Sequence, residues 1–353
     1  MSRYHSRVTL DDLARMAQEQ EASEPRPGRR RRPPRRRRAL RIVAWTVGVL
    51  VIVGIGLVAA FGLYLNHTVE ANVKHADLLP TAGAPAPTKS AAAKNSINML
   101  MIGSDSRGTD QGRSDVIILA HISDDRKRVD LIHFPRDMYV SIPGHGKDKI
   151  NAAYAYGGPP LLVETLQNLI SVPIEHVAVI DFSGFKAMTD AVGGVDVNVT
   201  QASPGFPVGR MHMNGEQGLT FVRDRHDLSQ GDISRGQRQE AFIKAVMLKG
   251  LSKDTLLNPL RLASFLDAAT SNMTVDQDFS TSRMRSLALS MRDVRGGDIH
   301  FWTAPWTGVG TSPAGASIVK VSYPQMKVLS QALTTDSMGG YSDPVSPTHG
   351  FSK

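Results

Sequence analysis

The strongest constraint in this sequence is residues 42–65, a run of 24 positions without one charged side chain. A helix of that length, at about 1.5 Å per residue, spans the roughly 30 Å hydrocarbon core of a bilayer with some tilt. Trp45 and Tyr64 stand near its two ends, where amphipathic rings favour the headgroup level. A cleaved signal peptide has a shorter apolar region, and core helices are rarely apolar on every face. We therefore predict a single transmembrane helix.

The charge distribution predicts the direction of this helix. Residues 1–41 hold 13 basic and 5 acidic side chains, which accounts for the whole formal net charge of +8. The positive-inside rule places this tail in the cytoplasm and everything after residue 65 outside the cell. Because the tail is rich in arginine and proline, it cannot bury a core and is expected to be largely disordered.

The composition after the anchor predicts three further regions. Residues 66–97 are rich in alanine and proline and are interpreted as an extracellular stalk. Residues 98–336 are expected to form the folded extracellular domain, and residues 337–353 a flexible C-terminal tail. Cysteine is absent, which excludes disulfides, thiolate zinc sites, iron–sulfur clusters and cysteine nucleophiles.

Short apolar segments alternate with amphipathic ones in the folded domain. The first strand-like runs, at residues 98–102, 116–122 and 129–134, are continuously apolar, which is typical of strands covered on both faces. Residues 234–250 form the clearest helix, with Ser234 and Gln237 as a capping box. Further elements are expected as helices at 159–170, 183–191, 258–269, 279–292 and 323–335, and strands at 175–181, 194–200 and 298–303. The pattern predicts an α/β fold in three layers, with a central sheet flanked by helices and preceded by the transmembrane helix.

Several common catalytic motifs are missing from the sequence. It contains no phosphate-binding P-loop, no H-E-x-x-H zinc motif, no G-x-S-x-G nucleophile turn and no G-x-G-x-x-G dinucleotide turn. Its 11 histidines show no metal-ligand spacing.

Arginine and aspartate side chains collect instead in the turns that follow or precede the apolar strands. The candidates are Asp105, Arg107, Arg113, Asp115, Arg136, Asp137, Arg223, Arg225, Asp232, Arg235, Arg238 and Gln239. Arginine presents a planar, permanently charged fork that matches phosphate oxygens, and nearby carboxylates can hold a hard divalent cation or act as a base. Surface ion pairs would be scattered, whereas these residues gather at strand ends and at one helix start, where open α/β sheets bind ligands. The set therefore predicts a diphosphate site.

The order of the motifs resembles the LytR–CpsA–Psr family. The resemblance is carried by GSDSRG (103–108), GRSD (112–115), FPRDMYVSIP (134–143), KINAAYAYGG (149–158), GGVDV (193–197) and VRDRHD through SRGQRQ (222–239). It covers residues 98–250 well and is only general beyond them. One small departure is the FPRD sequence, which leaves the Arg–Asp pair intact.

The resemblance implies a membrane-anchored phosphotransferase that moves a glycopolymer from a polyprenyl-diphosphate carrier to peptidoglycan. It implies that Asp105 and Asp115 hold Mg²⁺ or Mn²⁺, and that Arg136, Arg223, Arg225 and Arg235 bind the diphosphate. Arg107, Arg113, Arg238 and Gln239 would also bind the diphosphate, Asp232 would complete the polar mouth, and the prenyl chain would occupy an apolar tunnel. Asp137 and Asp232 are both candidates for the general base, and the sequence does not choose between them.

Other functions remain open from the sequence alone. A membrane-anchored regulator would use the basic tail, but the tail is broken by prolines and shows no helix-turn-helix, so no nucleic-acid partner is expected. A protein that binds lipid-linked saccharide without turnover would share the same site. Hydrolysis of the diphosphate is expected as a side reaction, with water in place of the sugar acceptor.

Overall fold

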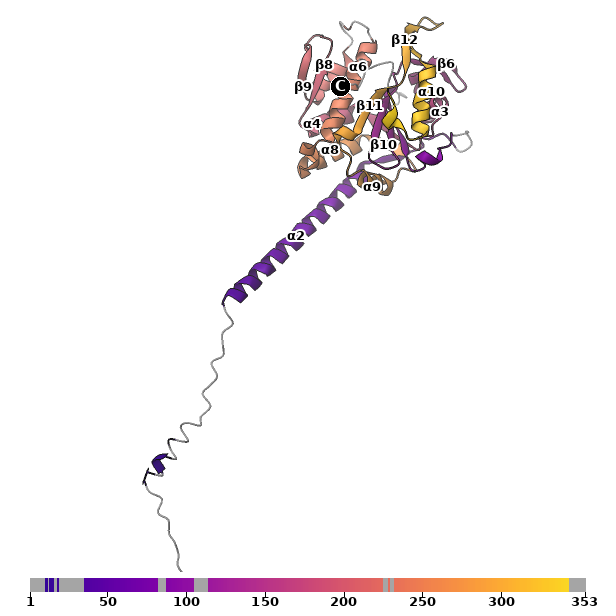
Figure 1. The fold of residues 1–353 in the computed structure, drawn as a ribbon. Coiled ribbons are helices and arrows are strands. Elements are labelled where there is room, and N and C mark those ends of the chain that lie inside the picture. Colours follow the sequence, from indigo (N-terminus) through magenta and orange to yellow (C-terminus); the bar gives the residue numbers. More distant parts are fainter. Residues whose placement is uncertain are drawn as a thin grey trace, which may run out of the picture. The chain divides into compact units, whose positions relative to one another are not determined.

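The computed structural model describes residues 10–11, 13–15, 18, 35–81, 87–104, 114–224, 228 and 232–342. The chain divides into two units, Met1–Phe61 and Gly62–Lys353. The elements of the second unit are labelled in Figure 1.

The apolar run lies on helix α2, Arg35–Asn72, which confirms the predicted long apolar helix. Its segment Val51–Asn72 is long and apolar enough to cross a membrane, and large side chains such as Ile52 and Val58 are exposed along it. Exposed apolar side chains on every face are what a lipid-embedded helix requires, so the helix indicates a membrane anchor. The helix continues past residue 65, and its last residues belong to the second unit.

The second unit is built around a seven-stranded mixed sheet in the order β1-β10-β7-β2-β3-β4-β11. In chain order the strands are β1 Lys74–Ala76, β2 Ile97–Ser104, β3 Ser114–Ile122, β4 Val129–His133, β7 His176–Asp181, β10 Met273–Asp276 and β11 Ile299–Thr303. β2 pairs antiparallel with β3 and parallel with β7, which places it at the centre. Segments 74–76 and 97 lie before the expected start of the domain at residue 98 but form part of this sheet.

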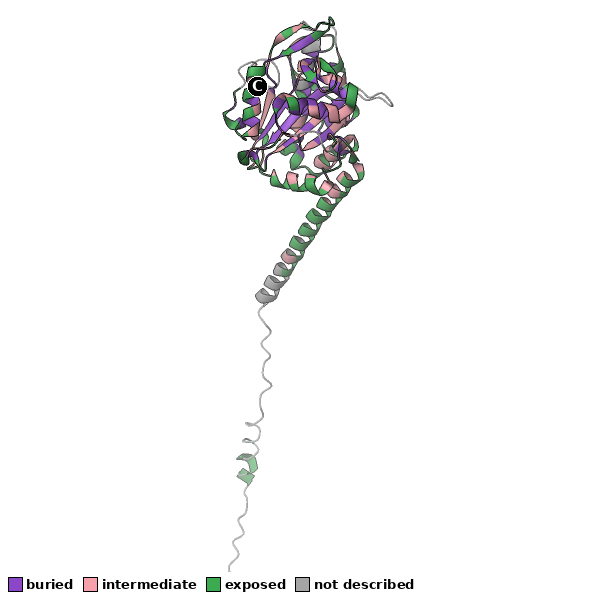
Figure 2. Ribbon diagram, turned by 90° about the vertical axis from the view of Figure 1, so that its right-hand side faces the viewer, coloured by how far each residue is buried: buried purple, intermediate pink, exposed green. Residues whose placement is uncertain are grey.

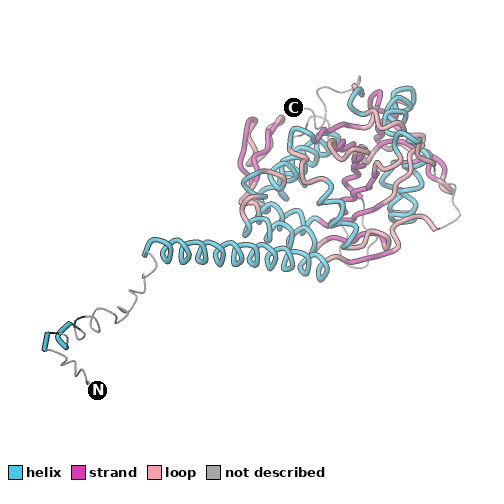
Figure 3. The backbone as a smooth tube through the Cα atoms, turned by 60° about the horizontal axis from the view of Figure 1, so that its bottom comes forward, coloured by secondary structure: helices cyan, strands magenta, loops and turns pink. Residues whose placement is uncertain are grey.

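Helices cover both faces of the sheet, which confirms the three-layer α/β architecture (Figure 3). Ile117 and Leu119 of β3 pack with α3 (Ile150–Ile170) and α10 (Tyr323–Thr334). Val116 and Ile118 point to the other face, where they meet α6 (Asp232–Gly250) and α9 (Thr281–Ser290). Because successive side chains alternate between two covered faces, both sets must be apolar, and Figure 2 shows the strands buried between the helices.

Two smaller sheets flank the central one. The four-stranded sheet has the order β12-β13-β5-β6, with β5 Met138–Ile142, β6 Gly146–Lys149, β12 Trp306–Thr311 and β13 Ser317–Val321. β8 (Val195–Val199) and β9 (Gly209–Met213) form a separate hairpin. The predicted strand at 194–200 is therefore a strand, but it lies outside the central sheet.

Two helices differ from the sequence expectation. α3 begins nine residues before the predicted start and contains a non-helical kink at Gly157 and Gly158. α6 begins at Asp232, so Ser234 lies inside the helix and the predicted capping box at Ser234 was wrong. The remaining helices are α4 Phe182–Ala191, α5 Gly215–Arg223, α7 Lys253–Leu256 and α8 Pro259–Ser271.

Candidate functional site

The ends of three neighbouring strands meet at one edge of the central sheet. Ser104 at the end of β2 is the register partner of Ser114 at the start of β3, across a β-bulge. The Phe134 amide, just after β4, donates to the Ile117 carbonyl at 2.9 Å, so the segment beyond β4 leaves at the same edge. Bulges are frequent next to active sites, where they redirect the chain.

This edge carries two buried hydroxyls, the Oγ atoms of Ser104 and Ser114. Neither has a hydrogen-bond partner among the residues that the structure describes. Asp105 and Asp115 directly follow these serines in the sequence. Buried polar groups normally have partners, so two such oxygens in register fit a site for a polar or charged ligand.

Gly103 allows the strands to approach closely beside these serines. A Cβ atom at this position would lie 2.9 Å from the Val116 Cβ on β3. The first glycine of the GSDSRG motif therefore serves the close pairing of β2 and β3 immediately before the site.

Arg136 and Asp137 lie beyond β4 in an ion-pair group that also contains Lys149. Lys149 Nζ is 2.8 Å from Asp137 Oδ1, and Arg136 Nε is 3.5 Å from Asp137 Oδ2. The backbone is fixed as well, because the Asn151 amide donates to the Arg136 carbonyl and the Val319 amide to the Asp137 carbonyl. The Arg136 guanidinium is thus mostly buried and held in a defined place at the strand edge.

A polar cavity of about 340 Å³ opens beside this ion-pair group. Its polar lining comes from Arg136, Asp137, Asp148, Lys149, Asn151 and Tyr156. The Tyr156 hydroxyl donates to Asp148 Oδ2 at 2.6 Å, and this hydrogen bond raises the pKa of the tyrosine. His145 stacks on the Tyr156 ring with centroids 4.6 Å apart, which gives the cavity an aromatic wall.

The second arginine group comes from α5 and α6. Asn214 and Gln217 form a capping box that starts α5, and the helix ends at the exposed Arg223. Arg235 and Gln239 lie one turn apart on α6, and they are only 3% and 5% exposed. Both are in the first two turns of α6, where the helix dipole also favours an anion.

Arg238 has contacts that give it a structural role. Its guanidinium lies 3.1 Å from Asp224 Oδ2, donates to the Gln201 carbonyl and the Ser203 hydroxyl at 2.9 Å each, and sits over the Phe221 ring. These contacts tie α6 to the end of α5, so we assign Arg238 to the fold rather than to the diphosphate contact expected from the sequence.

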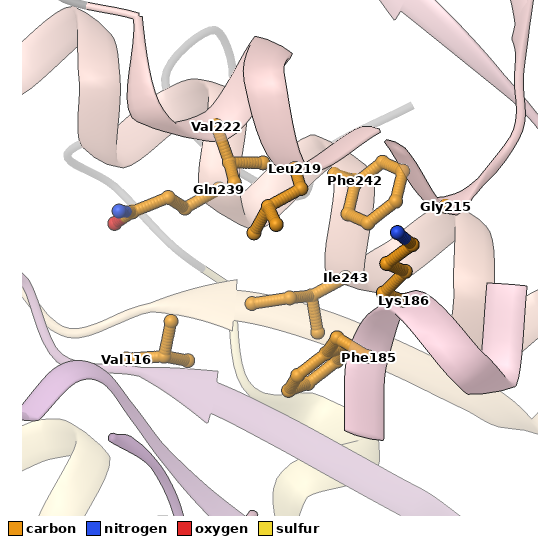
Figure 4. Close-up of a pocket in the computed structure, with 9 residues that line it drawn as sticks. All are labelled: Val116, Phe185, Lys186, Gly215, Leu219, Val222, Gln239, Phe242 and Ile243. Carbon is orange, nitrogen blue, oxygen red and sulfur yellow. The ribbon is translucent and has the colours of Figure 1, made fainter. Parts of the chain in front are cut away.

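An apolar cavity lies between the central sheet and helices α4, α5, α6 and α8. Its larger part, about 90 Å³, is lined by residues that include Ile102, Ile118, Ile180, Met247 and Phe265. A smaller part shares Val116, Phe185 and Ile243 with it and extends to Gln239. In Figure 4, Leu219, Ile243 and Phe185 converge on this space, and the polar ends of Gln239 and Lys186 lie on opposite sides of it.

Lys186 does not place a free charge in this apolar space. Its ammonium hydrogen-bonds to Glu216, and this contact raises the pKa of the lysine and lowers the pKa of the glutamate. Only its carbon chain is therefore available to line the cavity.

The structure covers only part of the predicted site. Asp105, Arg107, Arg113 and Arg225 lie outside the described residues, as do the side chains of Asp115 and Asp232. Within the described part of the chain, no group of three or more His, Asp or Glu side chains could hold a metal ion.

Sequence reasoning missed Lys149, Asp148 and Tyr156. Lys149 and the strand that carries it belong to a short hairpin in which GKDK shows no apolar alternation, so periodicity could not find it. The available signal was the KINAAYAYGG motif, which begins at Lys149 and contains Tyr156.

The chain is similar to known proteins over most of its length. The LytR_cpsA_psr family matches residues 63–335. A polyisoprenyl-teichoic acid–peptidoglycan teichoic acid transferase TagU from Bacillus cereus is 33% identical over 251 residues, which cover 69% of this chain and 82% of the relative. A protein of the same name from Enterococcus faecalis is 36% identical over 211 residues, covering 58% of this chain and 68% of the relative.

Solved structures show the same fold. Bacillus subtilis TagV has a TM-score of 0.57 at 25% identity and covers 69% of this chain and 98% of its own. TagT bound to LI-WTA has a TM-score of 0.56 at 26% identity and covers 73% of this chain and 98% of its own. With a family match over most of its length and relatives above 30% identity, the chain belongs to the LytR–CpsA–Psr family.

Proposed function

We propose that this protein is a membrane-anchored phosphotransferase that moves a glycopolymer from a polyprenyl-diphosphate carrier to peptidoglycan. The single observation that carries the proposal is the apolar cavity, which extends to Gln239 and is lined by Val116, two residues after the buried Ser114 that pairs with Ser104. An amphiphilic substrate with a hydrocarbon tail and an anionic head needs both environments side by side. The TagU relatives are named for this type of transfer, with teichoic acid as the polymer.

The donor is placed by matching its parts to these environments. The prenyl chain occupies the apolar cavity, and the diphosphate lies at its mouth against Arg136, Arg223, Arg225, Arg235 and Gln239. Arginine forks bind phosphate oxygens in pairs and neutralise charge in the transition state, which accounts for most catalysis in phosphoryl transfer.

The strand register also fits a divalent cation at the same edge. Asp105 and Asp115 directly follow the paired Ser104 and Ser114 in the sequence, and the proposal assigns the cation to these two carboxylates. Hard oxygens suit Mg²⁺ or Mn²⁺, which supplies charge neutralisation at the diphosphate when bound.

The acceptor enters by the polar cavity. A peptidoglycan hydroxyl forms a new P–O bond to the sugar-bearing phosphorus while the bridging P–O bond breaks. The electron pair of that bond leaves on polyprenyl phosphate, and the hydroxyl proton passes to a carboxylate, Asp137 or Asp232. Lys149 and Arg136 hold Asp137 in place beside the cavity. Water in place of the acceptor gives diphosphate hydrolysis as a side reaction.

The membrane orientation follows from the charge on the two sides of the anchor. The basic residues 1–41 stay in the cytoplasm and residues 66–353 face the wall, where both the lipid-linked donor and peptidoglycan are present. The energy of the reaction resides in the donor's diphosphate bond, so the site needs no nucleotide.

The test uses the purified full-length protein with a lipid-linked glycopolymer and peptidoglycan fragments. Arg223→Ala should leave the fold intact, because Arg223 is exposed. It should slow transfer by raising the activation free energy by about 2–5 kcal/mol. Arg210→Ala is the matched control, since Arg210 is an exposed arginine paired with Asp196 on the β8–β9 hairpin. Full transfer by the Arg223 variant would contradict the diphosphate assignment.

A second comparison separates the enzyme from a regulator. Removing residues 1–38 and replacing them with another cytoplasmic basic segment should leave transfer unchanged. Retained transfer supports the enzyme, whereas loss of cellular function with transfer intact would favour a regulatory role for the tail.

A further inference from the structure

Four leucines are exposed in residues 251–261, which run from the end of α6 through α7 to the first turn of α8. Leu257 and Leu260 are 79% and 81% exposed, and Leu251 and Leu256 are also classed as exposed. Single exposed leucines are common, but four within ten residues form an apolar patch of the kind that marks an interaction surface. We call residues 251–261 the leucine segment.

The charges around the leucine segment are mainly basic. Lys249, Lys253 and Arg261 stand among the leucines, and Asp254, 3.5 Å from Lys249, is their acidic counterpart. Leucines interspersed with lysine and arginine are typical of segments that lie in the interface of a bilayer with anionic headgroups.

Contacts within the second unit join the second half of α8, about 10 Å along that helix from Leu260, to the last residues of α2. Asn72, the last residue of α2, donates to Asp267 Oδ1 at 2.9 Å and to the Thr270 hydroxyl at 3.2 Å, both on α8. Arg285 on α9 donates to Asn66 Oδ1 at 2.9 Å.

The predicted membrane span ends at residue 65, seven residues before Asn72. That distance is about 10 Å along a helix. The same helix α8 that begins in the leucine segment is therefore fixed close to the point where the chain leaves the bilayer.

The leucine segment also adjoins the apolar cavity. A Cβ atom at Gly250 would lie 2.4 Å from the Phe265 ring, so the end of α6 and α8 are in direct contact. Phe265 and Met247 line the cavity at this end. Phe265 thus packs both against the end of α6, next to Leu251, and against the space assigned to the prenyl chain.

We propose that the leucine segment inserts into the interface of the membrane that carries the anchor and holds this end of the cavity against the bilayer. The occupant of the patch is the anionic lipid surface. Docking lets the prenyl chain pass between bilayer and cavity without exposure to water. The delivery role depends on the proposed function, whereas the contact with lipid does not.

The absence of cysteine makes the contact directly measurable. Full-length Leu257→Cys protein, labelled with an environment-sensitive fluorophore, is placed in nanodiscs that contain phosphatidylglycerol. We expect a blue-shifted emission and protection from a water-soluble quencher. The control is Val208→Cys, which labels a 66% exposed apolar residue next to the β8–β9 hairpin. Equal quenching of the two labels would show that residue 257 is exposed to water in the discs, and it would overturn the proposal.

A second variant tests delivery. Leu260→Glu, made in the labelled Leu257→Cys protein, should reduce the protection and weaken docking by about tenfold, as expected for losing the burial of one such side chain. Transfer from a long-chain donor in the membrane should fall, and transfer from a short-chain, water-soluble donor should not.

The two donors separate failure of the inference from failure of the proposed function. If neither donor is turned over by the unmodified protein, the proposed function fails, and the quenching result still decides the lipid contact. An equal loss on both donors would show that the leucines act through the fold or the chemistry, and would overturn the delivery role.

Discussion

Two arginines three positions apart on α6 illustrate how environment decides the role of a residue. Arg238 is enclosed by Asp224, Gln201, Ser203 and the Phe221 ring, all of them protein groups. Arg235 shares a face with Gln239, which lines the apolar cavity. The sequence shows the same side chain in the same motif, and only the packing separates a structural arginine from a candidate ligand.

Replacing Arg238 by alanine should destabilise the protein strongly. It removes the Arg238 charge from the mostly buried Asp224, and breaking a buried ion pair typically costs about 3–5 kcal/mol in the free energy of unfolding. Denaturant unfolding of the full-length protein in detergent measures the loss. Arg210→Ala breaks an exposed pair and should cost about 0–1 kcal/mol, so equal losses would contradict the structural role of Arg238.

Asp276 on β10 should make stability depend on acid pH. Burial alone raises the pKa of its carboxyl, but hydrogen bonds from His176 and the Val177 amide outweigh burial, and the pKa is lowered. The folded state therefore binds this proton more weakly than the unfolded state. The stabilisation is present above the unfolded pKa of about 4 and is lost as the pH falls through the lowered folded pKa.

Melting temperatures between pH 3 and pH 7 test this sign. Asp276→Asn should be less stable than the unmodified protein at pH 7 and should lose part of the acid dependence. If the melting temperature of the variant changed with pH as steeply as that of the unmodified protein, the acid sensitivity would come from other carboxylates.

At the scale of elements, the close approach of α5 and α6 forms one end of the apolar cavity. A Cβ atom at Gly218 would lie 2.1 Å from the Phe242 ring, so only glycine allows the helices to pack at this distance. Leu219 and Val222 on α5 then face Phe242 and Ile243 on α6 across the cavity.

Gly218→Ala should push α5 away from α6. Overpacking of this kind costs about 1–3 kcal/mol in the free energy of unfolding, and the displaced Leu219 and Val222 should lower transfer as well. Gly297→Ala is the control, because a Cβ atom at Gly297 meets nothing within 4 Å. A Gly218 variant as stable as the Gly297 variant would show that the helices can separate without cost.

The elements that the sequence predicted are those with a strong local pattern. β3 and β4 read as continuously apolar because both of their faces are covered, and the long apolar helix is evident from length alone. β6 and β12 of the four-stranded sheet were missed because GKDK at 146–149 and WTGVGT at 306–311 alternate weakly and depend on pairing with other strands.

The candidate site was predictable as a set of residues but not as an arrangement. Arginine and aspartate at strand ends indicated the chemistry, and the register of Ser104 with Ser114 shows why those ends meet. Lys149 reaches Asp137 because β6 pairs antiparallel with β5. No local pattern in the sequence indicates that ion pair.

At the scale of the whole molecule, the apolar cavity lies inside the core that holds the fold together. Ile243 lines both parts of the cavity and packs with β3. A cavity in a protein core lowers the free energy of unfolding in proportion to its volume. The space of about 90 Å³ here costs about 2 kcal/mol on that scale.

Ile243→Phe should therefore separate stability from activity. The larger ring fills part of the space, so the free energy of unfolding should stay the same or rise, while transfer from a long-chain donor should fall. Comparing thermal unfolding with transfer rates for this variant tests the assignment of the cavity to the prenyl chain. A variant that keeps full transfer would place the chain elsewhere.

Because the cavity is part of the core, occupancy by the carrier and resistance to unfolding are thermodynamically linked. With the prenyl chain bound there as proposed, a loaded molecule should open less often than an empty one. A protease that cleaves only the opened form should therefore digest the loaded protein more slowly.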